Sequence, residues 1–308
     1  MEIGDWDDLR VFLAVARAES LSGAGRALRL DPATVGRRIA RLEAGLGVPL
    51  FLKSPQGYAM TEEGGRLFAQ GMRAEQVLAE AMQEVQGEPG RLSGTIRVGA
   101  PDGCANYLLP QVTAAIVAEN PGLEVQIVAL PRVFNLSKRE ADMAVAVSRP
   151  EAGRLTVQKV TDYRLHLAAA RGWLAGRPPI RALADLRGQP VIGYIPDMIF
   201  DREIDYLSEI GAETVTYGSN SVSVQFNWVR QGAGIGVVHD FAIPSAPEVV
   251  RVLPEAFGLT RSFWLIRHGD DRRVERLSRF ADRLIAGLRR EVGRLEALAA
   301  VQGAPAPA

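Results

Sequence analysis

Three arginines stand close together on one short predicted helix near the start of the chain. Arg37, Arg38 and Arg41 belong to the stretch "DPATVGRRIARLE". Asp31 is a good N-cap and the proline after it suits the first helical position, so we expect a helix to begin there. Arginine carries a planar fork of donors that fits guanine edges and phosphates. These residue types predict binding to the major groove of DNA rather than catalysis.

The predicted helix has two different faces. One face repeats apolar side chains at helical spacing, and we expect it to be buried; it consists of Val35, Ile39, Leu42 and Leu46. Thr34, Arg37 and Arg41 point away from that face, and Arg38 lies at its flank. The alternative is a helical hairpin whose arginines only meet water, because the first 60 residues hold eight Lys or Arg against seven Asp or Glu. DNA binding requires the nearby acids, Asp5, Asp7, Asp8 and Glu19, to lie away from the DNA.

Further short elements complete a small domain over residues 1–60. A helix over 7–18 should bury Leu9, Phe12, Leu13 and Ala16, and "GAGRAL" should form a short helix before a tight turn. Two short helices joined by a tight turn are typical of a helix-turn-helix. The stretch "LGVPLFLKSPQGYAMT" predicts a β-hairpin, or wing, with Gly57 near its turn. Lys53 at the base of this wing is a further candidate for contact with the DNA backbone or minor groove.

Residues 61–86 are expected to form one long helix. Thr61 is a plausible N-cap, and Glu62 and Glu63 suit the positive end of a helix. A heptad pattern runs along this helix and predicts a dimerisation seam made of Leu67, Gly71, Ala74, Leu78, Ala81 and Val85. The alternative is that this face packs on its own domain. A twofold dimer would predict a dyad-symmetric operator.

The second half of the chain has a different pattern. A breaker-rich hinge over 87–94 precedes alternating strands and helices over 95–300, which is typical of a parallel α/β sheet. We divide this part into lobe I, about 95–161 with 269–300, and lobe II, about 162–268. Helices are expected over 106–120, 201–211, 224–232 and 271–298, and the tail over 301–308 is expected to be disordered.

A cleft between two such lobes is a candidate ligand site. Ligands of open α/β sheets bind where the strands end and helices begin. The stretches at such ends are "GAPDGCAN", "ALPRVFN", "YIPDM", "YGSNSVS" and "VVHD". The candidate effector-binding residues are Pro101, Asp102, Gly103, Cys104, Ser219, Asn220 and Ser221, each of which is equally a turn or cap residue. Cys104 is either a reactive thiol near a helix start or, as we favour, a buried inert one.

Composition and motifs exclude several classes of protein. The 308 residues carry equal numbers of basic and acidic side chains, and no run of 18 apolar residues predicts a membrane span. The acidic N-terminus does not read as a signal peptide, and one cysteine allows no internal disulfide, so we expect a cytoplasmic protein. The three histidines are far apart in sequence, and "GAGIG" follows a helix rather than a strand. We therefore expect no enzyme, no metal site and no cofactor.

The sequence resembles the LysR-type transcriptional regulators. The residues that carry the resemblance are "SLSGAGRALRLDPATVGRRIARLEAGLGVPLFLKSPQGYAMTEEG", "LADLRGQPVIGY", "NLSKREADMAV" and "QGAGIGVV". The resemblance covers about residues 5–292. It implies an α/β multidomain protein: a winged helix-turn-helix, a long linker helix that pairs protomers into dimers or tetramers, and a two-lobed effector domain like a periplasmic binding protein. Double-stranded DNA and a small-molecule effector are the implied partners.

Some positions depart from the family pattern. Asp31, Pro32 and Ala33 stand where the family usually has a serine followed by Gln-Pro, and Gly36 stands where a serine is common at the DNA. Lys53 replaces a common arginine. Asp102 replaces a hydroxyl residue, and its charge disfavours an anionic effector unless it caps a helix. The competing hypothesis is a small-molecule-binding protein with a fused helical module that does not bind specific DNA.

Overall fold

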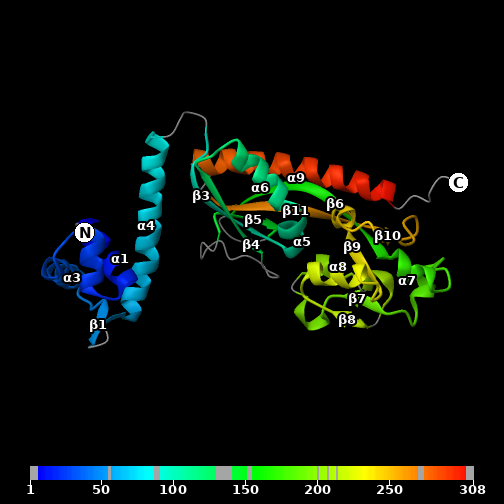
Figure 1. Cartoon of the computed structure of the whole chain (residues 1–308), viewed down its shortest axis with the longest axis horizontal. Coiled ribbons are helices and arrows are strands. Elements are labelled where there is room, and N and C mark those ends of the chain that lie inside the picture. The colour runs from blue at the N-terminus through cyan, green and yellow to red at the C-terminus, as the bar shows by residue number, and fades with distance from the viewer. Residues whose placement is uncertain are drawn as a thin grey trace. The chain divides into compact units, whose positions relative to one another are not determined.

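The computed structural model describes residues 6–54, 57–86, 91–129, 141–150, 155–199, 201–206, 208–212, 214–269 and 274–302. The chain forms two compact units, Met1–Pro89 and Gly90–Ala308. Figure 1 shows the elements of each unit.

The first unit contains three short helices around one small core. They are α1 (Trp6–Ala18), α2 (Leu21–Leu28) and α3 (Pro32–Leu46). The expected start of α3 is confirmed, because the Asp31 carboxylate caps the Thr34 backbone N–H. The expected burial of Val35 and Ile39 is also confirmed. Leu46 was expected in the same face but is 49% exposed, since the helix ends there with Gly47 in a left-handed conformation.

The predicted wing is present as an antiparallel hairpin of β1 (Phe51–Ser54) and β2 (Gly57–Met60). Gly57 has φ +135°, and a Cβ there would lie 2.7 Å from the Glu19 carbonyl oxygen, so the wing needs a glycine to approach the end of α1. The adjacent Tyr58 N–H donates to that carbonyl at 2.9 Å. This bond fixes the wing against the helical core.

The long helix α4 (Glu62–Gln86) begins as expected, with the Thr61 hydroxyl accepting from the Gly64 N–H at 2.9 Å. Its first half packs on α1 of the same unit. Leu67 contacts the core of this unit, and Gly71 is buried so closely that a Cβ there would lie 2.9 Å from Leu13 Cδ2. Gly71 is therefore covered by α1 and Leu67 packs on the core of its own unit, as the alternative to a dimerisation seam expects, while the seam itself stays a prediction.

The second half of α4 differs from the first. Ala74 is half-buried, whereas Leu78 is exposed, and Met82 on the same face is exposed as well. The side chains of Ala81 and Val85, which complete the predicted seam, lie outside the described part of the structure. The side chain of Lys53 in β1 is likewise outside it.

In the described residues of the second unit, nine strands form one mixed sheet in the order β4-β3-β5-β11-β6-β9-β7-β8, with β10 beside β6. The strands are β3 (Gly94–Ala100), β4 (Leu123–Ala129), β5 (Met143–Ala146), β6 (Leu155–Ala170), β7 (Val191–Gly193), β8 (Tyr217–Gly218), β9 (Ile235–His239), β10 (Val249–Arg251) and β11 (Leu259–His268). The expectation of a parallel sheet holds within each lobe, where β3 pairs with β4 and β5, and β7 with β8 and β9. It is wrong between the lobes, because β6 and β11 run antiparallel to each other and cross from one lobe to the other.

Helices cover both lobes. Lobe I carries α5 (Asp102–Tyr107) and α6 (Leu109–Ala118), and lobe II carries α7 (Arg171–Ala175) and α8 (Val222–Arg230). The single helix expected over 106–120 is divided at Leu108. The helix expected over 201–211 is wrong, because the described residues there form short 3-10 turns, at Arg202–Ile204 and Ser208–Ile210.

The last helix, α9 (Glu275–Gln302), lies along both lobes (Figure 1). Its final residue, Gln302, donates from its side chain to backbone carbonyls of lobe II, at 2.8 Å to Ala246 and 3.0 Å to Val249. The disordered tail predicted from residue 301 is therefore wrong for 301–302, and 303–308 lie outside the described residues.

Candidate nucleic-acid interface and ligand cleft

The N-terminal corner of α3 presents two of the predicted DNA-contacting side chains together. The Asp31 carboxylate accepts from the Thr34 N–H at 2.9 Å and from its hydroxyl. These bonds lower the pKa of Asp31 and hold Thr34 in place. The Arg37 guanidinium donates to the Thr34 hydroxyl oxygen at 3.0 Å and is exposed. A hydroxyl and a guanidinium are thereby ordered at one point of the helix surface.

The other two arginines of α3 are engaged by α1. Arg38 forms an ion pair with Asp7, which lowers the pKa of that carboxyl group. Arg41 makes a bidentate contact with Asp8 at 2.5 Å for each nitrogen, and the Asp8 side chain is almost fully buried. Asp7 and Asp8 therefore already bind two of the three arginines, whereas the expectation that these acids lie away from the DNA stays a prediction.

Sequence reasoning did not find these ion pairs because the partners are more than 30 residues apart. Nothing in the local spacing of "WDDLR" indicates which arginine each acid faces. Gly36, the remaining candidate on α3, lies beside α2, where a Cβ would be 3.4 Å from Leu21 Cδ1. It therefore adds close packing between α2 and α3 but offers no side chain for hydrogen bonding.

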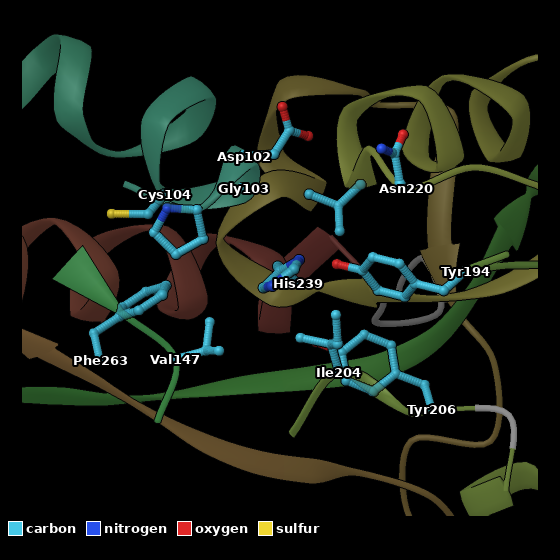
Figure 2. A pocket seen from close by; sticks show the side chains of 12 residues that line it. Asp102, Gly103, Cys104, Val147, Tyr194, Ile204, Tyr206, Asn220, His239 and Phe263 are labelled. Atoms are coloured by element: carbon cyan, nitrogen blue, oxygen red, sulfur yellow. The ribbon is translucent and has the colours of Figure 1, made fainter. Parts of the chain in front are cut away.

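In the second unit, five of the seven predicted effector residues line one pocket (Figure 2). The pocket encloses about 400 Å³, including its opening to solvent. The five are Pro101, Asp102, Gly103, Cys104 and Asn220. Ser219 and Ser221 do not line it but belong to the turn that begins α8, where Ser221 is the N-cap. This empty space is narrow, and in this arrangement it has room for little more than a water-sized group.

Seven further residues line the pocket: Val147, Tyr194, Ile204, Tyr206, Val222, His239 and Phe263. Tyr194 and His239 fall in stretches that the sequence analysis selected because they follow predicted strands, a criterion that we call the strand-end rule. Val147 directly follows β5, so the same rule would have found it. Tyr206 and Phe263 carried no such signal, because one follows a 3-10 turn and the other lies within a crossing strand. The stretch at 130–135, also selected by the rule, lies outside the described residues.

Burial keeps two ionisable groups of the pocket, His239 and Cys104, neutral. Burial lowers the pKa of His239 to about 4, so its imidazole is uncharged at neutral pH. Burial raises the pKa of the Cys104 thiol, which supports the interpretation of an inert cysteine. The Tyr206 hydroxyl is buried and finds no hydrogen-bond partner among the residues that the structure describes. Figure 2 shows the Tyr194 hydroxyl directed toward His239 across the pocket.

The described part of the chain contains neither a metal site nor a membrane-spanning helix. No group of three or more His, Cys, Asp or Glu side chains in this part of the chain is placed to hold a metal ion. Across the same residues, no helix combines the length and the apolar character needed to cross a membrane.

Comparison with protein families identifies both units. Residues 6–65 match the bacterial regulatory helix-turn-helix protein, lysR family, and residues 89–289 match the LysR substrate binding domain. The chain belongs to the LysR family of transcriptional regulators. This LysR-type protein therefore joins a helix-turn-helix DNA-binding domain to an effector-binding domain.

Individual relatives agree with this assignment. The HTH-type transcriptional regulator PtxR of Pseudomonas aeruginosa is 28% identical over 254 residues, which is 80% of this chain and 81% of PtxR. The solved structure of CrgA, a LysR-type regulator from Neisseria meningitidis, covers 92% of this chain and 98% of its own with a TM-score of 0.57 at 23% identity. A Corynebacterium glutamicum OxyR C206 mutant gives 0.61 at 20% identity, covering 98% of this chain and 97% of its own. The two structures support the fold.

Proposed function

We propose that this LysR-type regulator places the start of α3 in the major groove of its operator. Arg37 and Thr34 make the main contacts in this proposal. The observation that carries it is the ordered corner formed by these two residues, where an exposed guanidinium is held by a hydroxyl on the same helix. An arginine held in this way loses little side-chain freedom when it meets a guanine edge or a phosphate.

Arg38 and Arg41 have a different role in this proposal. Their guanidinium groups already bind Asp7 and Asp8, so a phosphate must compete with these carboxylates. We expect Arg41 to contribute more to the stability of the domain than to DNA affinity, because its loss leaves the buried Asp8 without a cation. Lys53 remains a candidate for a backbone contact from the wing.

Substituting the two arginines separately tests the assignment. The probe is a fluorescent duplex from the region upstream of the protein's own gene, titrated at two salt concentrations with excess competitor DNA. We expect Arg37→Ala to weaken specific binding by about 1–3 kcal/mol, roughly 5- to 150-fold, while the melting temperature is unchanged. We expect Arg41→Ala to lower the melting temperature and to change DNA affinity less.

The opposite result would show that α3 is not the recognition helix. If Arg37→Ala changes neither affinity nor its salt dependence on a duplex that the wild type binds specifically, the placement of α3 is wrong. If the wild type binds no DNA even at low salt, the competing hypothesis of a small-molecule-binding protein is favoured.

We also infer that a second copy of the chain covers the exposed half of α4. Leu78 is 42% and Met82 is 59% exposed, and both lie beyond the part of the helix that α1 covers. Leu78→Asp should shift the sedimentation of the protein toward the monomer, because a charge would replace an apolar contact. Val301→Asp, at a site that is 74% exposed on α9, is the control and should leave the assembly unchanged. Equal behaviour of the two variants would place the dimer interface elsewhere.

The pocket between the lobes is the proposed effector site, and the regulator is proposed to act in the cytoplasm, where it meets DNA. An effector that binds one arrangement of the lobes better than another shifts their population. Because the pocket in this arrangement has room for little more than a water-sized group, entry of a larger ligand requires lobe I and lobe II to separate first.

A further inference from the structure

The carboxylate of Asp102 reaches from lobe I to lobe II. One of its oxygens accepts from the Ser221 hydroxyl and from the Ser223 backbone N–H, each at 2.9 Å. The other oxygen accepts from the Asn106 side-chain amide on its own helix at 3.0 Å. Asp102 begins α5 of lobe I, whereas both serines belong to the start of α8 in lobe II. These bonds therefore join the two sides of the cleft.

The carboxylate of Asp102 lies at the N-terminus of α8, which is the end of a helix that favours an anion. The first turn of α8 carries unpaired backbone N–H groups and the positive end of the helix dipole. The Ser223 N–H is one of these groups, and Ser221 is the N-cap. The chain itself supplies the anion that the Ser223 N–H binds.

Other contacts between the lobes agree with a closed arrangement. The rings of Tyr107 in lobe I and Phe226 in lobe II pack edge to face with centroids 5.6 Å apart. A Cβ at Gly103 would lie 3.1 Å from Val222 Cγ2, so α5 approaches lobe II closely there. Ser148 of lobe I donates a hydrogen bond to Asp201 of lobe II. Asp102 is thus one member of a set of contacts that hold the lobes together.

The remaining lining of the pocket determines which ligands it accepts. Among the described lining residues, Asp102 carries the formal charge, since His239 is neutral. The walls are otherwise apolar or aromatic, with Tyr194, Tyr206 and Phe263 among them. A ligand carboxylate would meet a like charge here, and two donors at the start of α8, the Ser221 hydroxyl and the Ser223 N–H, already bind Asp102.

We propose that Asp102 is a built-in carboxylate that occupies the start of α8 and latches the two lobes, so that the effector is an uncharged or cationic molecule rather than a free carboxylate. This inference rests on the proposed function of the pocket as the effector site. The aromatic walls provide the surface for an uncharged or cationic group, and the oxygen of Asp102 that faces Asn106 can accept one further donor.

Chemical rescue tests the latch on the full-length protein. We expect Asp102→Ala to lower the melting temperature by roughly 4–8 °C, because charge-assisted bonds between the lobes are lost. Replacing 100 mM sodium chloride with 100 mM sodium acetate should restore part of this loss, since acetate can occupy the vacated donors. The wild type should show no such gain from acetate or from sodium benzoate.

A matched control separates this effect from a general response to acetate. The carboxylate of Asp185 also accepts from two backbone N–H groups, those of Arg181 and Ala182 at 2.8 and 2.9 Å, but all three residues belong to lobe II. Asp185→Ala should gain no more from acetate than the wild type does. If Asp102→Ala does not fold, Asp102→Asn preserves the size and one acceptor oxygen, and it should be less stable than the wild type.

The outcomes decide between the latch and its absence. Stabilisation of the wild type by acetate or benzoate, beyond that by chloride, would overturn the proposal, as would an Asp102→Ala variant that melts and responds like Asp185→Ala. DNA binding of the same samples is measured in parallel. A wild type that binds its operator but is stabilised by carboxylates refutes the latch alone, whereas absent DNA binding refutes the proposed function.

Discussion

The junction between the wing and α4 allows a stability change to be worked out from two adjacent glycines. A Cβ at Gly64 would lie 2.1 Å from the carbonyl oxygen of Leu50 and 3.1 Å from its carbon. That carbonyl is fixed, because it accepts from the Thr61 N–H at 3.0 Å. A Cβ at Gly65 would meet nothing within 4 Å. The two glycines are consecutive residues of the same helix, but an added Cβ would clash with the backbone at Gly64 and meet open space at Gly65.

The expected changes in unfolding free energy follow from two effects. Replacing glycine by alanine in a helix favours folding by about 1 kcal/mol. At Gly64 this gain is opposed by overpacking against a backbone atom that cannot rotate away, which costs about 3 kcal/mol or more. We expect Gly64→Ala to destabilise the first unit by about 2 kcal/mol and Gly65→Ala to stabilise it by up to about 1 kcal/mol.

Urea unfolding of the full-length protein measures both changes. Trp6 is the single tryptophan in the sequence of the first unit. A change in tryptophan fluorescence that disappears when Trp6→Phe is introduced therefore reports the unfolding of this unit. Gly64→Ala should also weaken DNA binding, because the strain displaces the wing relative to the helical core. Equal stability of the two alanine variants would refute the close approach of α4 to Leu50.

Two further predictions concern the buried groups of the cleft. Cys104 is fully buried, so iodoacetamide should modify it in the native protein at a rate limited by unfolding, and mild urea should accelerate the reaction; rapid native labelling would contradict this. His239 has a pKa lowered to about 4 by burial, so the unfolded state takes up its proton first as the pH falls below about 6.5. Stability should therefore fall between pH 6.5 and 4, by about 2 kcal/mol between pH 7 and 5. His239→Asn should flatten this dependence, and an unchanged pH profile would show that His239 is not buried in neutral form.

The sequence predicted those features that depend on neighbouring residues. The N-caps at Asp31 and Thr61 and the wing turn at Gly57 each follow from a side chain or conformation within a few residues. The strand-end rule found most of one side of the cleft for the same reason. The rule could select positions such as Asp102, because the change from a strand pattern to a helix pattern can be recognised from neighbouring residues.

Features that depend on distant residues were missed. The pairing of Arg38 and Arg41 with α1 and the packing of Leu67 and Gly71 on the same helix require knowledge of which surfaces meet. A heptad pattern records only that a face is apolar, not whether its own domain or a second copy covers it. The antiparallel direction of the crossing strands β6 and β11 is equally a property of the whole sheet.

The helix α9 has a mechanical consequence. At about 1.5 Å per residue its 28 residues make a rod about 42 Å long. Its beginning holds the chain that enters the second unit, since Arg276 donates to the carbonyl of Ser93 at 3.0 Å, and its end is bonded to lobe II through Gln302. A rod fixed at both ends resists a simple clamshell opening of the lobes. Separation of the lobes must therefore either keep the bonds at both ends of α9 or break those at one end.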